Sequence, residues 1–343
     1  MTLRPFKILT TLLTLLLITL VTSNFNYLNA QSDEPLTDQM RELLKSEAFN
    51  VGFLFQSDVT FSFKDDNFLG GDAFGLGPTR LKFDGISDGG FSYKMALELR
   101  RSPTVWDASV GYKKSDAFGI KTGMHKVDIG LDLQPGPGSI DFISRARLIN
   151  LMTNRREVGV TAYGDIDQFD YAIGVYNGTG RNLQNDDNFM YLLKGGYTFD
   201  LNDGGTLYVV ANGALNGTVG ENIGGLTTEG DRLLYGGYVD YESDSWFGSA
   251  ELLITEFESI QLPEEETITG AYVTIGNRVT DEDELLVRWD YIGYDLRDTN
   301  SSLYILGWNH QFTSVVSLQI NALAQFEENE EFFGLAGNFQ YQF

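Results

Sequence analysis

The last eleven residues of the chain alternate between two kinds of side chain. One set is apolar and mostly aromatic, and it consists of Phe333, Leu335, Gly337, Phe339, Tyr341 and Phe343. The intervening set is small or polar, and it consists of Gly334, Ala336, Asn338, Gln340 and Gln342. Because successive side chains of a strand point to opposite faces, this pattern predicts a strand with one apolar face and one polar face. Lipid outside and water inside a closed barrel provide these two environments.

The same period of two extends back to Phe49 and predicts sixteen strands. Their expected ranges are 49–63, 74–85, 91–100, 104–113, 117–127, 156–165, 168–177, 189–200, 205–216, 231–242, 245–256, 267–279, 284–294, 302–311, 314–326 and 332–343. The predicted fold class is therefore all-β, a transmembrane antiparallel β-barrel of about sixteen strands.

The connections between these strands alternate in length. Those after even-numbered strands are short, as at 87–89 and 202–204, whereas most after odd-numbered strands are longer, as at 178–188 and 217–230. Barrels of this class have short periplasmic turns and longer external loops. The alternation and the even count therefore place both termini in the periplasm.

The third external connection, 128–155, is the longest. It passes through Pro135-Gly-Pro-Gly and then through Ile143, Leu148 and Leu151, which alternate with arginines and predict a short helix. A connection of this length is usually either functional or disordered, and its apolar residues argue against disorder. We expect this third external loop to fold into the lumen.

The amino-terminal region predicts export. Arg4 and Lys7 precede an uncharged apolar run, 8–21, and a polar stretch then ends at Ala30. This is the pattern of a signal peptide spanning 1–30, with cleavage before Gln31. The competing interpretation, a transmembrane helix, needs about 20 apolar residues.

Two further segments complete the expected domain organisation. A polar periplasmic segment, 31–47, follows the signal peptide, with Met40, Leu43 and Leu44 at helical spacing. A disordered tether is the alternative for this segment. The transmembrane β-barrel then occupies 48–343.

Composition agrees with a barrel and limits the partners. The 38 Gly, 17 Tyr and 24 Phe with no Cys indicate many strands and tight turns without disulfides. The net charge of −24 argues against a nucleic-acid partner. Residues 197–343 hold 4 Lys or Arg against 25 Asp or Glu, so the acidity belongs mainly to the second half.

The acidic clusters lie mostly in loops and turns, where solvation explains them. Rim carboxylates that hold divalent cations, and so bridge anionic lipids of the outer membrane, are the alternative. No cluster has the ordered spacing of a calcium loop, so we predict no metal site and no cofactor.

Several basic residues fall on the polar face of strands whose other face is apolar. They are Arg80, Lys82, Lys94 and Lys121. Such residues can simply solvate the bore, because a water-filled lumen needs a polar lining. They can also form an electropositive track that attracts small anions along a low-dielectric wall.

Four arginines lie on or beside the long third loop, at Arg145, Arg147, Arg155 and Arg156. If the loop folds into the lumen, these side chains line its narrowest point, where guanidinium groups bind phosphate or carboxylate through paired hydrogen bonds. Alternatively, Arg155 and Arg156 pair with acidic residues of the wall and hold the loop in place.

The sequence offers no catalytic constellation. The chain has two histidines, His125 and His310, and neither has a nucleophile or acidic partner that the sequence reveals. Hydrolytic sites generally need such a combination on one face. We therefore predict packing roles for both histidines and a protein that is not an enzyme.

Several stretches in the first half of the chain form a recognisable set. They are Arg80-Leu-Lys-Phe-Asp-Gly, Phe91-Ser-Tyr-Lys, Trp106-Asp-Ala-Ser-Val-Gly-Tyr, Gly119-Ile-Lys-Thr-Gly-Met-His-Lys, Arg155-Arg-Glu-Val-Gly-Val and Tyr171-Ala-Ile-Gly-Val-Tyr-Asn-Gly-Thr-Gly-Arg. On these stretches, the chain resembles the phosphate-selective porin O and P family over roughly residues 74–200. The resemblance implies a sixteen-stranded outer-membrane porin, usually a homotrimer, whose third loop narrows a channel for phosphate or related anions.

Two departures from the family leave the choice of solute open. The second half of the chain is strongly acidic, and the basic residues are fewer than a dense phosphate-binding ladder needs. The resulting prediction is a porin for passive diffusion of small anions, with phosphate as the family-based candidate. The alternatives are a general diffusion porin with weak or cation selectivity, and a structural or adhesive barrel plugged by its own loop.

Overall fold

The computed structural model describes residues 46–63, 68–183, 187–202 and 204–343. Within them, the chain forms seventeen strands that join in one sheet. The strands are β1 Asn50–Ser62, β2 Ala73–Leu76, β3 Arg80–Ser87, β4 Phe91–Glu98, β5 Thr104–Ser115, β6 Phe118–His125, β7 Glu157–Ile166, β8 Phe169–Tyr176, β9 Met190–Asp200, β10 Thr206–Ile223, β11 Leu226–Glu242, β12 Trp246–Ser259, β13 Glu266–Arg278, β14 Asp283–Tyr294, β15 Thr299–Thr313, β16 Val316–Glu327 and β17 Glu331–Gln342. The helical elements are η1 Phe68–Gly70, η2 Asp88–Gly90 and α3 Arg147–Met152.

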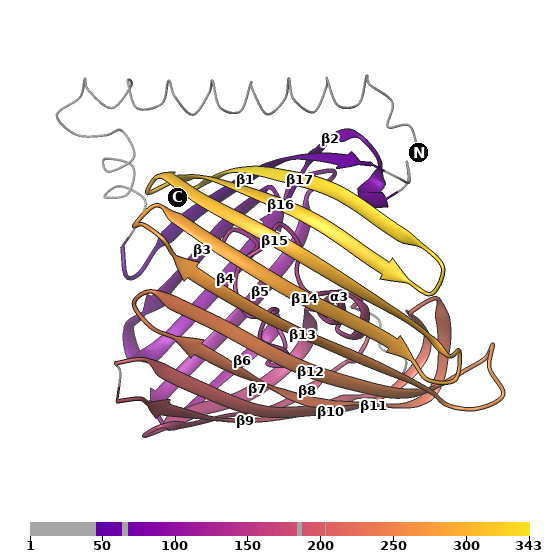
Figure 1. The fold of residues 1–343 in the computed structure, drawn as a ribbon. Helices are drawn as coiled ribbons and strands as arrows, with labels where there is room; N and C mark the ends of the chain where they lie inside the picture. Colours follow the sequence, from indigo (N-terminus) through magenta and orange to yellow (C-terminus); the bar gives the residue numbers. More distant parts are fainter. Residues whose placement is uncertain (1–45, 64–67, 184–186, 203) are drawn as a thin grey trace, which may run out of the picture.

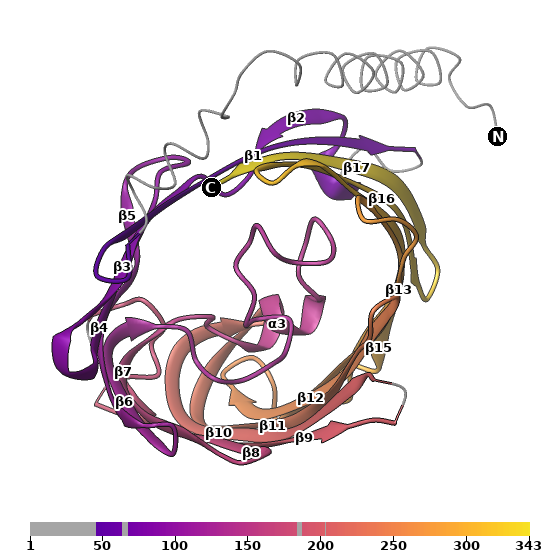
Figure 2. The ribbon, with the colours of Figure 1, turned by 90° about the vertical axis from the view of Figure 1, so that its left-hand side faces the viewer.

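The sheet closes on itself through its first and last strands. β1 and β17 pair antiparallel from Leu54 opposite Gln342 to Ser62 opposite Gly334. Figure 1 shows the tilted strands from the side, and Figure 2 shows the closed ring. Closure leaves no exposed sheet edge at the joint, as a lipid environment requires.

The barrel wall has sixteen positions, because β2 and β3 together occupy one of them. β3 pairs with the first part of β1, and β2 pairs with its later part, from Ser57 opposite Leu76 to Thr60 opposite Ala73. The break between them contains Pro78, which has no N–H to donate to a ladder. The prediction of a sixteen-stranded antiparallel barrel is confirmed, and the predicted strand 74–85 is interrupted at this proline.

The side chains of the wall alternate between two environments. In β14, Leu285 and Val287 are both 49% exposed, whereas Leu286 and Arg288 are at most 2% exposed. The first pair faces outward, where lipid takes the place of water, and the second pair faces the interior of the barrel.

The two ends of the barrel differ, and we name them here. The turn end carries the short connections and the start of β1 and end of β17, and the loop end carries the long connections. The prediction of a loop at 217–230 is wrong. β10 and β11 continue through this region as a hairpin that turns at Gly224 and Gly225, whose φ angles are 58° and 86°. The predicted signal peptide, 1–30, and nearly all of the segment 31–47 lie outside the described residues.

Candidate functional site

The long connection between β6 and β7, which we call the inner loop (126–156), contacts the inward-facing side of the barrel wall. Figure 2 draws α3 and its flanking segments inside the ring of strands. The predicted short helix corresponds to α3, which spans Arg147–Met152. The site is built from this loop and the strands around it.

One side of the inner loop forms a hydrophobic core with strands β8 to β14. The buried loop residues of this core are Val127, Ile129, Leu133, Ala146, Leu148, Ile149 and Met152. The wall contributes Tyr176, Met190, Leu192, Ala214, Leu234, Leu253, Phe257, Ile268, Tyr272 and Ile292, and the hairpin tip adds Ile223 and Leu226. Each fully buried aliphatic side chain stabilises this docking by about 2 kcal/mol.

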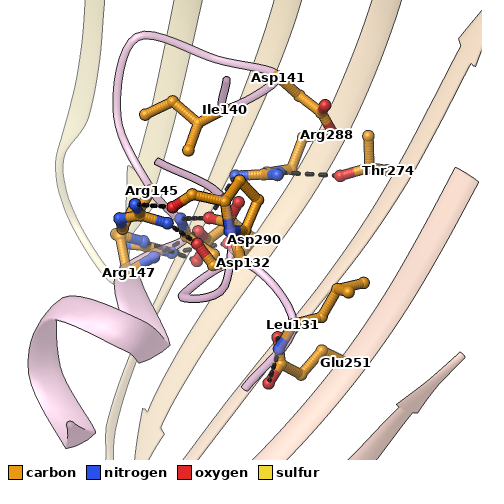
Figure 3. Close-up of polar contacts among 12 residues, drawn as sticks. Leu131, Asp132, Ile140, Asp141, Arg145, Arg147, Glu251, Thr274, Arg288 and Asp290 are labelled. Carbon is orange, nitrogen blue, oxygen red and sulfur yellow. Dashed lines mark hydrogen bonds and ion pairs between the residues drawn. The ribbon is translucent and has the colours of Figure 1, made fainter. Parts of the chain in front are cut away.

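Charged groups also hold the inner loop against the wall (Figure 3). Arg147 Nε lies 3.0 Å from Asp290 Oδ1, and Arg288 Nη1 lies 3.4 Å from Asp132 Oδ2. The Leu131 backbone N–H donates to the Glu251 carboxylate at 3.1 Å. Since several of these charges are buried, each one depends on its partner for compensation.

The far end of the loop is held by a row of side-chain amides that we call the amide seam. The Gln56 side chain donates to Pro137 O at 3.0 Å, and that of Gln340 donates to Gly138 O at 2.9 Å. The side chains of Gln319 and Asn309 donate to Ile140 O and Asp141 O, each at 2.9 Å. In the opposite direction, Asn321 Oδ1 accepts from Ile143 N at 2.9 Å. These amides come from β1, β15, β16 and β17. They satisfy backbone groups of the loop, which lies outside the strand ladders of the wall.

Four of the eight predicted basic residues form ion pairs. Arg80 pairs with Glu98 at 3.0 Å, Lys121 with Asp128 at 3.0 Å, Arg147 with Asp290 at 3.0 Å and Arg156 with Asp107 at 3.2 Å. Arg147 also donates to Ser301 Oγ at 2.7 Å. Arg147 therefore holds the loop, and Arg156 joins the start of β7 to the wall at β5.

The other four predicted residues have no carboxylate within ion-pair distance among the described residues. They are Lys82, Lys94, Arg145 and Arg155. Arg145 donates to the carbonyl oxygens of Asp132 and Pro135 instead. A methyl group added at Gly136 would lie 3.6 Å from Lys82 Nζ, so β3 and the inner loop approach closely at this ammonium group.

Six of the predicted residues lie close enough to interact electrostatically, and we call them the basic cluster. They are Arg80, Lys82, Lys94, Arg145, Arg155 and Arg156. Arg80 and Lys82 are two residues apart on one face of β3, a step of about 6.8 Å along the strand. Lys94 extends the row on β4, opposite Asp84.

A bulge in β5 brings an aromatic ring to the same region. The pairing of β4 with β5 shifts between Ala96 opposite Asp107 and Leu97 opposite Val105, which leaves Trp106 as the extra residue. Bulges commonly redirect a side chain next to a functional site. The guanidinium carbons of Arg80, Arg156 and Arg181 lie 4.6, 5.3 and 4.1 Å from the centre of the Trp106 ring. Cation–π attraction therefore gathers three positive charges around one indole.

Burial and mutual repulsion alter the titration of the loop groups. Burial lowers the pKa of Lys126 to about 6, and the charges of Arg156 and Arg145 add to the effect. Burial also lowers the pKa of Arg145, to about 10, although Asp132 opposes the change. At neutral pH Arg145 stays charged, whereas Lys126 is largely neutral and we do not count it in the basic cluster.

The sequence of the chain settles its family. The pattern that defines phosphate-selective porin O and P matches residues 49–230, more than half of the 343 residues. The chain belongs to this family of porins. The predicted resemblance is confirmed, and it extends beyond the region 74–200 on which we based it.

Solved structures show the same porin fold at low sequence identity. OmpT of Vibrio cholerae is 14% identical, with 88% of this chain and 99% of that chain covered and a TM-score of 0.62. The anion-selective porin from Comamonas acidovorans is 14% identical, with 86% and 99% covered and a TM-score of 0.64. The outer-membrane channel DcaP of Acinetobacter baumannii is 10% identical, with 86% and 97% covered and a TM-score of 0.59. Comparison with curated protein sequences gives no significant match.

The family and the fold make this chain an outer-membrane channel protein of the porin type. No helix among the described residues is long and apolar enough to cross a membrane. In the same part of the chain, no group of three or more His, Cys, Asp or Glu residues is arranged to hold a metal ion.

The porin interior also contains an acidic cavity of about 720 Å³ at the turn end. Its lining includes Asp141, Asp244, Glu282 and Glu284, against the single arginine Arg278. The positive and negative charges of the interior are therefore separated. The basic cluster lies along β3, β4 and the later part of the inner loop, whereas the acidic cavity lies among β13 to β17 and the turn before β12.

Sequence reasoning missed two residues of the site. Trp106 is brought into the interior by a bulge that strand alternation does not reveal. Arg181 follows the turn glycines of an external connection and reaches back over Trp106. The one sequence signal for both is that each belongs to a stretch that resembles the porin family.

Proposed function

We propose that this porin conducts small anions past the basic cluster and that the inner loop narrows the pore there. The observation that carries the proposal is the set of four cations without carboxylate partners among the described residues, Lys82, Lys94, Arg145 and Arg155. An ion pair presents little net charge, whereas an uncompensated cation in a low-dielectric passage attracts anions. A preference for small anions follows.

Reversal potentials in a salt gradient across a planar bilayer test the proposal. The wild-type protein should give the sign of anion preference. Lys82→Gln and Arg155→Gln should each lower the anion-to-cation permeability ratio by about fourfold or more, as expected for one unit charge about 5 Å from the ion in water. The matched control is Lys113→Gln, because Lys113 is 47% exposed at the turn end and pairs with Asp116. A cation-selective wild type would overturn the proposal.

The acidic cavity supports a second candidate, a general diffusion porin with weak or cation selectivity. Its carboxylates line the turn end, so they favour cations at that mouth. Neutralising Glu282 and Glu284 together would then raise the anion preference more than the basic-cluster variants lower it. A barrel plugged by its own loop would show no single-channel conductance at all.

Phosphate is the solute that the family name suggests, and the chemistry of the site fits it. Guanidinium and ammonium groups bind phosphate through charge-assisted hydrogen bonds. Phosphate added to a chloride solution should reduce the chloride current if it occupies the basic cluster. In the Arg155→Gln variant, a higher phosphate concentration should be needed for the same reduction.

The assembly and the route to the membrane are part of the proposal. OmpT of Vibrio cholerae has been solved in a trimer form, which supports a homotrimer here. Crosslinking in detergent tests for this trimer, and amino-terminal sequencing of the mature protein tests cleavage before Gln31. We propose a channel and not an enzyme, since both ring nitrogens of His125 are engaged, one with Gly123 O and the other with the Thr161 hydroxyl, and that hydroxyl is itself bonded to Tyr176 at 2.7 Å.

A further inference from the structure

A buried carboxylate organises the turn that follows β8. Glu157, the first residue of β7, is 0% exposed. Its carboxylate accepts from the backbone N–H of Gly178 at 3.1 Å, from that of Gly180 at 3.0 Å and from the Asn154 side chain at 2.8 Å. Every one of these contacts is a donor, and a carboxylate is the side chain that offers only acceptors.

The turn has the backbone that this arrangement requires. Gly178 and Gly180 have φ of 79° and 67°, a region that other residues rarely adopt. A Cβ at Gly178 would overlap the Asn216 side chain, which itself donates to Gly178 O at 3.1 Å. The path of the chain after Gly180 is therefore fixed by Glu157 and its neighbours.

The next residue along this path is Arg181. Its guanidinium lies 4.1 Å from the centre of the Trp106 ring and interacts electrostatically with Arg155. Arg181 is exposed, whereas Arg80 and Arg156 around the same ring are buried and ion-paired. Arg181 thus adds an accessible positive charge at the loop end of the basic cluster.

We propose that Glu157 is a positioning residue for selectivity: although it is an acid, it increases the anion preference of the pore because it holds Arg181 over Trp106. The proposal rests on the proposed function. Charge alone predicts that replacing an interior acid by a neutral residue raises the anion preference of the pore. The positioning role predicts the opposite, that replacing Glu157 lowers it.

The test compares Glu157→Gln with Arg181→Gln in the full-length protein by reversal potential in a potassium chloride gradient. Glutamine has one acceptor oxygen and an NH₂ group, so it faces at least one backbone N–H with a donor. We expect Glu157→Gln to lower the anion-to-cation permeability ratio by about fourfold or more, the same loss that we expect for Arg181→Gln. In the double variant the two losses should not add, because both act through one guanidinium.

Two further variants keep the test decisive. Gly180→Ala disturbs the same turn without changing charge, because φ of 67° is strained for alanine. It should also lower the ratio, and it replaces Glu157→Gln if that variant does not fold. Asp165→Asn removes an exposed acid from the same face of β7, and it should leave the ratio unchanged or raise it.

An unchanged or raised ratio in Glu157→Gln would overturn the inference, and so would additive losses in the double variant. These are shifts relative to the wild type. The sign of the wild-type potential separately decides the proposed function.

Discussion

Two parts of the inner wall, β3 to β7 and β8 to β14, face the same interior but differ in character. The first part carries Arg80, Lys82, Lys94 and Lys121 on its inward face. The second part carries apolar residues such as Leu192, Leu234 and Leu253 at its inward positions. The difference shows that apolar side chains line the wall only where the inner loop covers it, and that charged side chains of this part, such as Arg288 and Asp290, are paired with the loop.

This comparison also explains how a long loop can keep one position. The hydrophobic core and the ion pairs fix the loop against β8 to β14, so its charged side can face β3 to β5 without movement. Substitutions on the two sides should therefore separate stability from selectivity.

The largest expected effect comes from breaking a buried ion pair on the docking side. Asp132→Ala leaves the Arg288 guanidinium, which is 1% exposed, without its carboxylate. The free energy of unfolding should fall by about 3 to 5 kcal/mol, measured by urea titration in lipid vesicles. The control is Glu242→Ala, whose partner Arg278 is more exposed, and its cost should be at most about 1 kcal/mol. Equal effects would refute the distinction between the buried and exposed pairs.

A neighbouring pair of leucines tests the apolar docking surface. Leu253 is 0% exposed and packs in the core with the loop, whereas the adjacent Leu252 is 44% exposed and faces outward. Leu253→Ala should cost about 3 kcal/mol because a cavity remains. Leu252→Ala should cost less, since acyl chains fill the space. Protease cleavage in the inner loop should increase only in Leu253→Ala.

The amide seam should give a smaller effect. Gln340→Ala removes one donor to the loop, at Gly138 O, and should cost about 1 kcal/mol. Single-channel recordings should show greater current noise, because this end of the loop is held less firmly. Gln325→Ala is the control, since its side chain bonds to Glu327 and not to the loop. Identical noise in both variants would contradict a role for the seam.

The smallest effect concerns pH. Burial raises the pKa of Asp141, in the inner loop, to about 6. This carboxyl group lines the acidic cavity, so it is mostly charged above pH 6 and mostly neutral below it. Anion preference should therefore rise as the pH falls from 8 to 5. Comparison with Asp141→Asn isolates the contribution of this group, and an identical pH response in the variant would refute it.

Much of the fold could be predicted from alternation alone, because a barrel between lipid and water imposes a period of two on every strand. The predicted strands 156–165, 284–294 and 332–343 agree with β7, β14 and β17 to within a residue or two. The hairpin extension of β10 and β11 was missed, since its Gly-rich, polar sequence has the composition of a loop. Its strand structure depends on contacts with the inner loop and neighbouring connections.

The site was less predictable than the fold. The faces of Arg80, Lys82, Lys94 and Lys121 follow from strand parity, and in the structure these four residues share the inward face of β3, β4 and β6. Parity says nothing about which cation finds a carboxylate. The pairs of Arg147 with Asp290 and of Arg156 with Asp107 join residues 143 and 49 positions apart, so only the closed barrel brings them together.

The amide seam has a consequence for biogenesis. Gln56 belongs to the first strand and Gln340 to the last, and they bond to each other at 2.7 Å as well as to consecutive carbonyls at Pro137 and Gly138. The tip of the inner loop therefore contacts both strands of the joint, and its docking position does not exist until β1 and β17 have paired. In a nascent barrel that is still open, the inner loop cannot yet occupy this position, so closure of the wall must precede maturation of the pore.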